Sequence, residues 1–193
     1  MSRKKQEASP IKYVESDLPQ VEKVDAFLIA EHISSKDTPQ ARSLFDYSRF
    51  GELKGNKIIY SYFEALYLVE KEKMNVFINK KQLDFDSLFN KLKKLDKSLT
   101  VKYTVFKDLR SRGYIVKTAL KFGADFRVYD KGVKPGDDHA KWVVYPVHEN
   151  NTLTWYEFSD KNRVAHSTRK HLLVAIVDDE LDVTYYTIAW TRP

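Results

Sequence analysis

Three polar side chains stand at the edges of three apolar, strand-like segments, and each could contribute to acid–base or electrostatic chemistry. Tyr129 lies on the polar side of the alternating stretch ADFRVYD, His139 precedes AKWVVYPV, and Lys170 precedes HLLVAIV. Histidine changes its charge near neutral pH and can therefore act as a general acid or base. A lysine beside a buried strand supplies a fixed positive charge. The pattern alone also fits a tyrosine with a surface hydroxyl, an exposed loop histidine and a strand-edge lysine.

The other histidines have less support from their surroundings. His166 and His171 flank Lys170, whereas His32 and His148 have no supporting context. No H-E-x-x-H spacing or paired histidine and carboxylate indicates a metal site, and the chain has no cysteine. The glycine-rich phosphate-binding motifs and the nucleophile elbow G-x-S-x-G are also absent. We therefore expect no metal and no other cofactor.

The composition limits the kind of protein. The chain has 193 residues, of which 42% are hydrophobic and 13% aromatic, so one or two packed domains are expected. No apolar run approaches the ~18 residues of a membrane span, and the N-terminus lacks the apolar core of a signal peptide. These features predict a soluble cytoplasmic protein with no membrane partner. The net charge of +6 favours a polyanionic partner but fits other basic proteins equally well.

The N-terminal half predicts a small α/β domain behind a polar arm. The arm covers residues 1–20, and a strand follows over residues 21–30. Thr38 and Pro39 predict the start of a helix, because threonine caps helices and proline is tolerated in the first turn. Gly51 is the predicted stop of that helix.

Turn and capping signals continue through the rest of this half. Residues 55–56, Gly-Asn, predict a turn before the short strand KIIY. Ser61 and Glu64 form a capping-box pattern, which predicts a helix over FEALYLV. MNVFI is a further predicted strand, and residues 85–95 carry apolar side chains at helical spacing.

The second half predicts a strand-rich domain that begins near residue 98. Ser98 is the predicted cap of a helix that Gly113 ends. The sequence as a whole predicts an α+β fold with two small domains. The N-terminal domain, residues 21–97, combines helices with a small antiparallel sheet, and the C-terminal domain, residues 98–193, has a mixed sheet flanked by helices. Its predicted elements are strands at 114–118, 124–130 and 140–147, a helix from 154 toward 163, and strands at 172–177 and 183–190.

Longer strings carry a more specific signal than periodicity does. YTVFKDLRSRGYIVKTALKFGADFRVYDKG, DDHAKWVV and RVAHSTRKHLLVAIVDDELDVTYY together resemble the archaeal tRNA-intron (tRNA splicing) endonuclease family. FGELKGNKIIYSYFEALYLVEK is similar to the N-terminal domain of that family. The resemblance covers about residues 40–193 and leaves the first 20 residues outside. It implies that residues 98–193 form a nuclease domain that works without a metal.

The resemblance implies a catalytic triad of Tyr129, His139 and Lys170. Family enzymes cut precursor tRNA at bulge–helix–bulge junctions and leave 2′,3′-cyclic phosphate and 5′-hydroxyl ends. The nucleophile is the 2′-hydroxyl beside the scissile phosphate, which restricts the substrate to RNA. Tyr129 would be the general base, His139 the general acid and Lys170 the stabiliser of transition-state charge. Arg163 resembles one of two arginines that hold a flipped base; the second is not placed, with only Arg192 beyond the last strand.

The resemblance also implies an assembly of four units. The chain holds one unit, so a homotetramer is implied, or a heterotetramer with a structural subunit. Residues 183–190 would pair across a two-fold axis, and the acidic turn Asp178-Asp179-Glu180 resembles a family loop that docks into another unit. Two alternatives stay open. One is a non-catalytic RNA-binding or scaffolding subunit, and the other is a metal-dependent nuclease that uses Asp125 and Glu157.

Overall fold

The chain forms two mixed sheets, one in each half, with helices packed against both. The computed structural model describes residues 18–119, 123–131 and 139–191. The predicted α+β fold, with an N-terminal and a C-terminal domain, is confirmed. Most of the predicted arm, residues 1–20, lies outside the described residues. Among the helices of the described ranges, none combines the length and the apolar character that crossing a bilayer requires.

The N-terminal sheet has six strands within the described residues, in the order β3-β4-β2-β1-β5-β6. β1 and β5 run parallel and the other pairs are antiparallel, so the sheet is larger and more mixed than the small antiparallel sheet that we predicted. Its elements are β1 (Val24–Ile29), β2 (His32–Lys36), α1 (Pro39–Ser48), β3 (Glu52–Lys54), β4 (Lys57–Tyr60), α2 (Tyr62–Glu70), β5 (Met74–Ile78), β6 (Lys81–Leu83) and α3 (Phe85–Lys93).

The predicted start signals of α1 and α2 are confirmed. The Thr38 hydroxyl accepts the backbone N–H of Ala41, with proline in the first turn of α1. Ser61 and Glu64 form the complete capping box of α2: the serine hydroxyl accepts the Glu64 N–H, and the Glu64 carboxylate accepts the Ser61 N–H. Both helices thus begin where a side chain can satisfy an otherwise unpaired backbone donor.

The predicted stop of α1 at Gly51 is wrong. The helix ends at Arg49, which has a left-handed backbone (φ 58°) and donates its N–H to Phe45 O, while the N–H of Phe50 donates to Leu44 O. Gly51 also has a positive φ of 77°, but glycine is required at this position because of close packing. A Cβ at this position would lie 2.4 Å from Cγ2 of Ile58. Glycine is needed there because the chain passes so close to β4.

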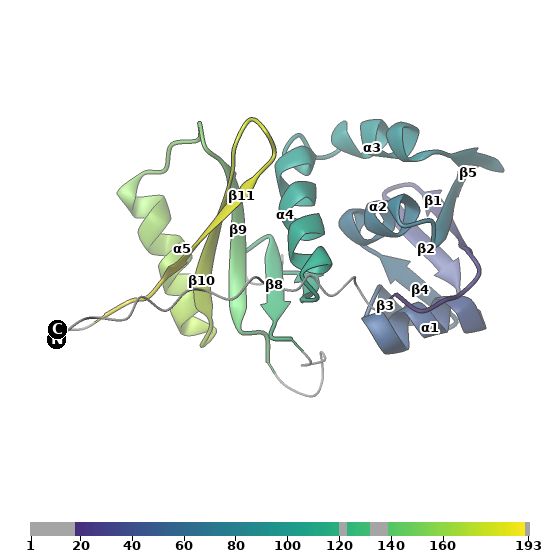
Figure 1. Cartoon of the computed structure of the whole chain (residues 1–193), viewed down its shortest axis with the longest axis horizontal. Helices are drawn as coiled ribbons and strands as arrows, with labels where there is room; N and C mark the ends of the chain where they lie inside the picture. The colour runs from purple at the N-terminus through teal and green to yellow at the C-terminus, as the bar shows by residue number, and fades with distance from the viewer. Residues whose placement is uncertain (1–17, 120–122, 132–138, 192–193) are drawn as a thin grey trace, which may run out of the picture.

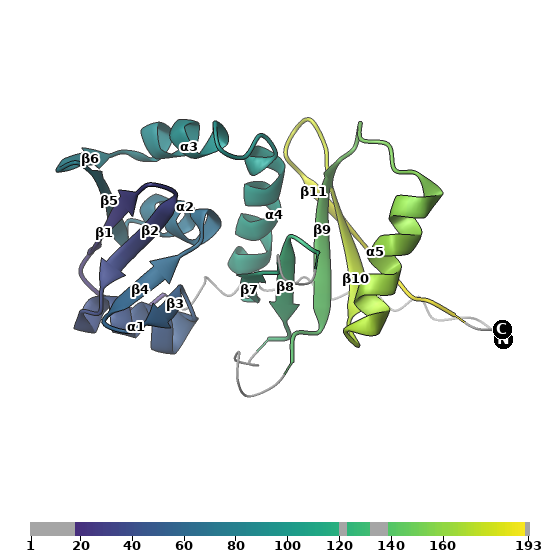
Figure 2. The same cartoon turned by 180° about the vertical axis from the view of Figure 1, so that it is seen from behind.

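The C-terminal sheet is a layer between two helices. α4 covers one face together with the N-terminal domain, and α5 covers the other (Figures 1 and 2). β9 and β10 are parallel, and α5 is the crossover between them, whereas the remaining pairs are antiparallel. The strand order is β11-β10-β9-β8-β7. The elements are α4 (Leu99–Ser111), β7 (Ile115–Thr118), β8 (Phe126–Tyr129), β9 (Trp142–His148), α5 (Trp155–Ser167), β10 (His171–Val177) and β11 (Val183–Ile188).

Of the two signals predicted for the ends of α4, the stop at Gly113 is present and the side-chain cap by Ser98 is not. Gly113 has a φ of 84°, and the N–H of Tyr114 donates to Leu109 O, as in a helix that ends on a left-handed glycine. Ser98 precedes the helix but makes no side-chain cap. Its hydroxyl donates instead to the carboxylate of Asp96.

α4 joins the two halves through a shared core. The Phe63 ring of α2 lies 4.9 Å, centroid to centroid, from the Phe126 ring of β8 in an edge-on contact, and Phe106 of α4 packs against both. Tyr67 of α2 also meets Phe106 edge-on. Because one apolar cluster spans both sheets, the domain boundary near residues 97–98 stays a prediction.

A buried ion pair links α2 to β7 inside this core. Lys117 Nζ lies 2.7 Å from Glu64 Oε1, and the two side chains are 8% and 5% exposed. Lys117 also donates to Gly51 O, and the Glu64 carboxylate accepts the Gly51 N–H. Burial alone raises the pKa of the Glu64 carboxyl. The charge and hydrogen bond of Lys117, with the N–H groups of Ser61 and Gly51, outweigh burial and hold this pKa below its ordinary value.

A second buried cation lies beside the pair. Arg110 of α4 donates to Ser48 O at 2.8 Å, and its guanidinium carbon lies 3.8 Å from the centroid of the Phe50 ring. Burial lowers the pKa of Arg110 to about 10, which still leaves the group charged at neutral pH. The Glu64 carboxylate therefore faces two buried cations, both from the C-terminal half.

We predict that Glu64→Gln lowers the unfolding free energy at pH 7 by about 3–5 kcal/mol, because Lys117 then stays buried without a counter-charge. The pKa of Glu64 is lower in the folded state than in the unfolded chain. Its contribution is therefore complete above the ordinary glutamate range and is lost as the pH falls through the folded value. Denaturant titrations from pH 7 to pH 3 should show wild type and variant converging in acid.

Glu52→Gln, an exposed change on β3, is the matched control and should leave stability unchanged. The double variant Glu64→Gln with Lys117→Met should recover part of the loss. A Glu64→Gln protein as stable as wild type at pH 7 contradicts the prediction.

Candidate active site

A single residue ties three chain segments together at one end of the C-terminal sheet. The backbone N–H of Lys141 donates to Val128 O at 2.9 Å, and Lys141 O accepts the N–H of His171 at 2.9 Å. The segment before β9 is therefore held between the end of β8 and the start of β10. This is the lower end of the sheet in Figure 1, where β8 points downward and β9 and β10 begin.

The three candidate residues belong to these three segments. Tyr129 is the last residue of β8, His139 lies just ahead of β9, and Lys170 immediately precedes β10. Neighbouring strands are about 4.8 Å apart, so the backbones of Tyr129 and Lys170 lie roughly 10 Å apart with the β9 segment between them. Tyrosine and lysine side chains are long enough to reach a phosphate group bound across that gap.

Tyr129 is a buried residue rather than the surface tyrosine that its pattern also allowed. Val128 packs into the core on the α4 side, so alternation directs Tyr129 to the α5 side. The residue is only 5% exposed. Its ring is thus fixed by its surroundings at the edge of the sheet.

Lys170 is fixed by the way α5 ends. Arg169 has a left-handed backbone (φ 55°) and donates its N–H to His166 O, and the Lys170 N–H donates to Ala165 O. This pair of bonds is typical of helices that end on a left-handed residue. Lys170 Nζ donates to Thr168 O at 2.9 Å, which keeps the ammonium group at the C-terminal end of α5, on the α5 side of the sheet.

His139 is exposed and lies at this same end of the sheet. The predicted loop before it, residues 132–138, lies outside the described residues. The other histidines are engaged elsewhere or exposed in other positions. The His166 ring packs against Trp190 at a tilt of 52°, with ring centroids 4.6 Å apart, and His148 Nε2 lies 3.2 Å from Asp179 Oδ1. His171 is exposed at the start of β10, and His32 is exposed on β2.

The two carboxylates considered as metal ligands have structural partners. Asp125 Oδ1 lies 3.0 Å from Lys102 Nζ. Glu157 belongs to the capping box of α5, and hydrogen bonds from Thr154 lower its pKa. Searching the described ranges finds no group of three or more histidine, aspartate or glutamate side chains that could hold a metal ion.

Sequence inspection missed two lysines near the three candidate residues. Lys141 Nζ lies 2.6 Å from Asp130 Oδ2 and 4.5 Å from the centre of the Trp142 ring, and this hydrogen bond lowers the pKa of Asp130. Lys131 Nζ lies 5.1 Å from the centre of the Tyr114 ring. The lysine–tryptophan pair that opens β9 was the available signal, because a cation beside an aromatic residue at a strand end is suited to RNA.

Arg163 lies about one helical turn before the end of α5. Its guanidinium is exposed and lies 2.6 Å from Asp160 Oδ1. It borders a surface pocket of about 340 Å³ whose other walls include Phe158, His166 and Trp190. Arg192, considered for a second base-holding arginine, lies outside the described residues.

Comparison with known families decides the assignment. Residues 99–185 match the family model described as "tRNA intron endonuclease, catalytic C-terminal domain". Residues 24–89 match the model described as "tRNA intron endonuclease, N-terminal domain". The chain belongs to the tRNA intron endonuclease family. The resemblance found in the sequence strings is thus confirmed, and this endonuclease carries the catalytic domain of an enzyme family.

Curated relatives agree over nearly their full lengths. A tRNA-splicing endonuclease of Thermococcus gammatolerans is 40% identical over 166 residues, covering 86% of this chain and 97% of the relative. The protein of the same name from Pyrococcus abyssi is 39% identical over 169 residues, covering 88% and 97%. That of Nanoarchaeum equitans is 42% identical over 154 residues, covering 74% and 99%.

Proposed function

We propose that this endonuclease excises introns from precursor tRNA at bulge–helix–bulge junctions, with Tyr129, His139 and Lys170 as its catalytic residues. The observation that supports the proposal is the meeting of three strand ends around Lys141, to which these three residues are attached. A base, an acid and a fixed cation at one sheet end are the groups that metal-free phosphodiester cleavage requires.

The proposed reaction is an internal transesterification. The 2′-hydroxyl beside the scissile phosphate attacks phosphorus as Tyr129 accepts its proton. The bond from phosphorus to the 5′-oxygen breaks, and His139 donates a proton to that leaving oxygen. The products are a 2′,3′-cyclic phosphate and a 5′-hydroxyl, and no water or metal takes part in the balance. Lys170 offsets the charge that develops on the phosphoryl oxygens.

The surroundings of Lys170 and Tyr129 suit these roles. Lys170 is held by Thr168 O at the end of α5, so little rearrangement is needed when charge develops nearby. Tyrosine is almost entirely protonated at neutral pH, so a tyrosine base needs a cation close to it. Both residues lie on the α5 side at the same sheet end, which supports this pairing of functions.

Arg163 is the proposed contact to an unpaired base of the bulge. A guanidinium plane can stack on a splayed base, and the exposed Arg163 borders a pocket with aromatic walls from Phe158 and Trp190. The pocket adjoins the same helix that positions Lys170. A base held on α5 would therefore be fixed relative to the cleavage site.

The proposed assembly is a tetramer, formed by this chain alone or with a structural subunit. β11 is an edge strand, and the groove of about 330 Å³ beside it is lined by Leu153, Phe158 and Ile188 among other residues. Tyr186 on β11 is 54% exposed. An edge strand beside apolar surface suits pairing with another copy. In the acidic turn, Asp178 accepts the N–H groups of Glu180 and Asp182.

A non-catalytic RNA-binding or scaffolding subunit is the alternative function. It explains the basic charge and the exposed sheet edge equally well. It gives no role to the meeting of Tyr129, His139 and Lys170 at one sheet end.

We predict that His139→Ala slows cleavage of a bulge–helix–bulge RNA by roughly 10²–10⁴-fold in single-turnover assays. A substrate with sulfur in place of the scissile 5′-oxygen should restore most of the rate, because a thiolate leaves without a proton. His32→Ala, an exposed histidine on β2, is the control. Unchanged cleavage by His139→Ala supports the scaffolding alternative, and a lack of sulfur rescue contradicts the general-acid role.

We predict that a single 2′-deoxy substitution at the cleaved nucleotide abolishes cleavage there, whereas excess chelator leaves wild-type cleavage unchanged. The first result follows from the 2′-hydroxyl nucleophile and the second from the use of side chains alone. Product ends are identified by mass spectrometry. Activity that disappears in chelator and returns with Mg²⁺ supports the metal-dependent alternative.

We predict that the purified chain has the mass of four subunits in solution and is active. Light scattering coupled to gel filtration, with cleavage assayed across the peak, measures both properties. An inactive dimer that gains activity when a second subunit is added supports the heterotetramer. An active monomer contradicts the proposed assembly.

A further inference from the structure

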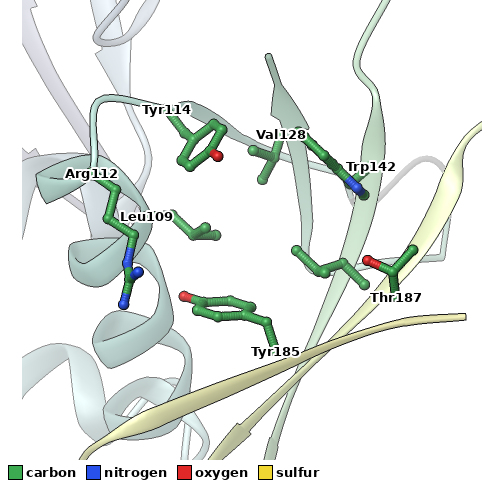
Figure 3. Close-up of a pocket in the computed structure, with 8 residues that line it drawn as sticks. Leu109, Arg112, Tyr114, Val128, Trp142, Tyr185 and Thr187 are labelled. Atoms are coloured by element: carbon green, nitrogen blue, oxygen red, sulfur yellow. The ribbon is translucent and has the colours of Figure 1, made fainter. Parts of the chain in front are cut away.

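A second cavity lies at the same sheet end, on the face opposite α5. It has a volume of about 190 Å³ and opens between the end of α4 and strands β8 to β11 (Figure 3). Its inner wall is apolar, formed by Leu109, Val128 and Leu173, all buried. Its outer walls are three aromatic side chains together with two polar residues: Tyr114, Trp142, Tyr185, Arg112 and Thr187.

The aromatic walls have fixed geometry. Tyr114 and Trp142 meet edge to face, with ring centroids 5.9 Å apart and planes at 89°. The Tyr185 hydroxyl donates to Asp108 Oδ2 at 2.7 Å, and Arg112 Nε donates to the same carboxylate oxygen at 2.8 Å. The cavity therefore exists before any ligand binds, and filling it costs little side-chain ordering.

Each of the three rings also has a cation close to it. Lys131 Nζ lies 5.1 Å from the Tyr114 centroid, and Lys141 Nζ lies 4.5 Å from the Trp142 centroid. The Arg112 guanidinium carbon lies 5.9 Å from the Tyr185 centroid. Asp130 and Asp108 pair with two of these cations, so the rim is polar and ionic rather than purely basic. A ligand with an aromatic face and an anionic backbone matches this combination.

The cavity adjoins the strand ends that hold the triad. Tyr114 directly precedes Ile115, which pairs with Tyr129. Trp142 pairs with His171, the residue that follows Lys170. The cavity and the triad thus share backbone segments while they lie on opposite faces of the sheet edge.

We propose that this cavity binds one unpaired nucleobase of the RNA substrate, next to the cleaved phosphodiester. The size is appropriate, because a protein cavity of about 150 Å³ accommodates a benzene ring. Stacking on tyrosine or tryptophan holds a base without demanding a particular sequence. The three cations at the rim provide contacts for the adjoining phosphates. The inference rests on the proposed function and adds a base contact separate from that of Arg163.

The test measures binding to an RNA that cannot be cleaved. A bulge–helix–bulge RNA with 2′-deoxy at both cleaved nucleotides is prepared as a series in which one nucleotide at a time is abasic. We expect one abasic position near the scissile phosphate to weaken binding to wild type by roughly 10-fold, the range of a single base stack. With Tyr114→Leu, intact RNA should bind about 10-fold more weakly, and the same abasic position should have no further effect.

Two additional variants separate loss of the ring from loss of the fold. Thr187→Phe, an exposed position on β11, adds a side chain at the mouth of the cavity and should also make binding insensitive to that abasic position. Tyr47→Leu removes an exposed tyrosine from α1 and should behave as wild type. If Tyr114→Leu does not fold, the base site is tested by comparing how wild type and Thr187→Phe bind the abasic series.

The outcomes distinguish this inference from the proposed function. Wild-type cleavage together with an abasic series that shows no coupling to Tyr114 or Thr187 overturns the base site and leaves the proposed function standing. A changed oligomeric mass of Thr187→Phe, with the abasic effect intact, identifies a contact between protein subunits and also overturns it. Wild type that neither binds nor cleaves the RNA overturns both.

Discussion

The carboxylate of Glu64 is the interaction on which the relation between the two halves depends. It closes the capping box of α2, accepts the N–H of Gly51 and pairs with Lys117 of β7, all within the buried core. A buried carboxylate is stable only while its partners stay in place, so the ion pair fixes α2 against β7. β7 pairs with β8, whose last residue is Tyr129. The position of the candidate base is thus linked by hydrogen bonds to the N-terminal domain.

In the C-terminal sheet, the residues that stabilise the fold and the candidate site residues lie in different parts of the strands. The middle of β9 and β10 is apolar on both faces and is covered by α4 and α5. Polar residues concentrate where these strands begin and β8 ends. Such an arrangement lets the core determine the spacing of the three segments, while Lys170 and His139 stay accessible to a polyanion. The two faces of this sheet end differ in character, with Tyr129 and Lys170 toward α5 and an aromatic cavity toward α4.

Local signals in the sequence predicted the elements well where the responsible atoms are close in the chain. Thr38, the Ser61–Glu64 box and Gly113 are such cases. Features that depend on contacts between residues far apart in the sequence were not predicted. β2 was missed because its polar residue Ser35 is satisfied by the Tyr60 hydroxyl, 25 residues away. The burial of Lys117 depends on Glu64, 53 residues distant. For the site, the residue types came from resemblance, and their meeting at one sheet end required the pairing of β8, β9 and β10.

The crossover through α5 has a consequence for biosynthesis. Strands β9 and β10 are parallel, so the chain must travel the length of α5 before Lys170 can reach the sheet. A ribosome that has released only the segment up to β9 has produced the proposed base and acid but neither the cation nor the strand that holds it. The nascent chain therefore gains its complete set of catalytic groups only after the inner strand β10 has inserted. The proposed catalytic site is therefore assembled only together with the completed C-terminal sheet.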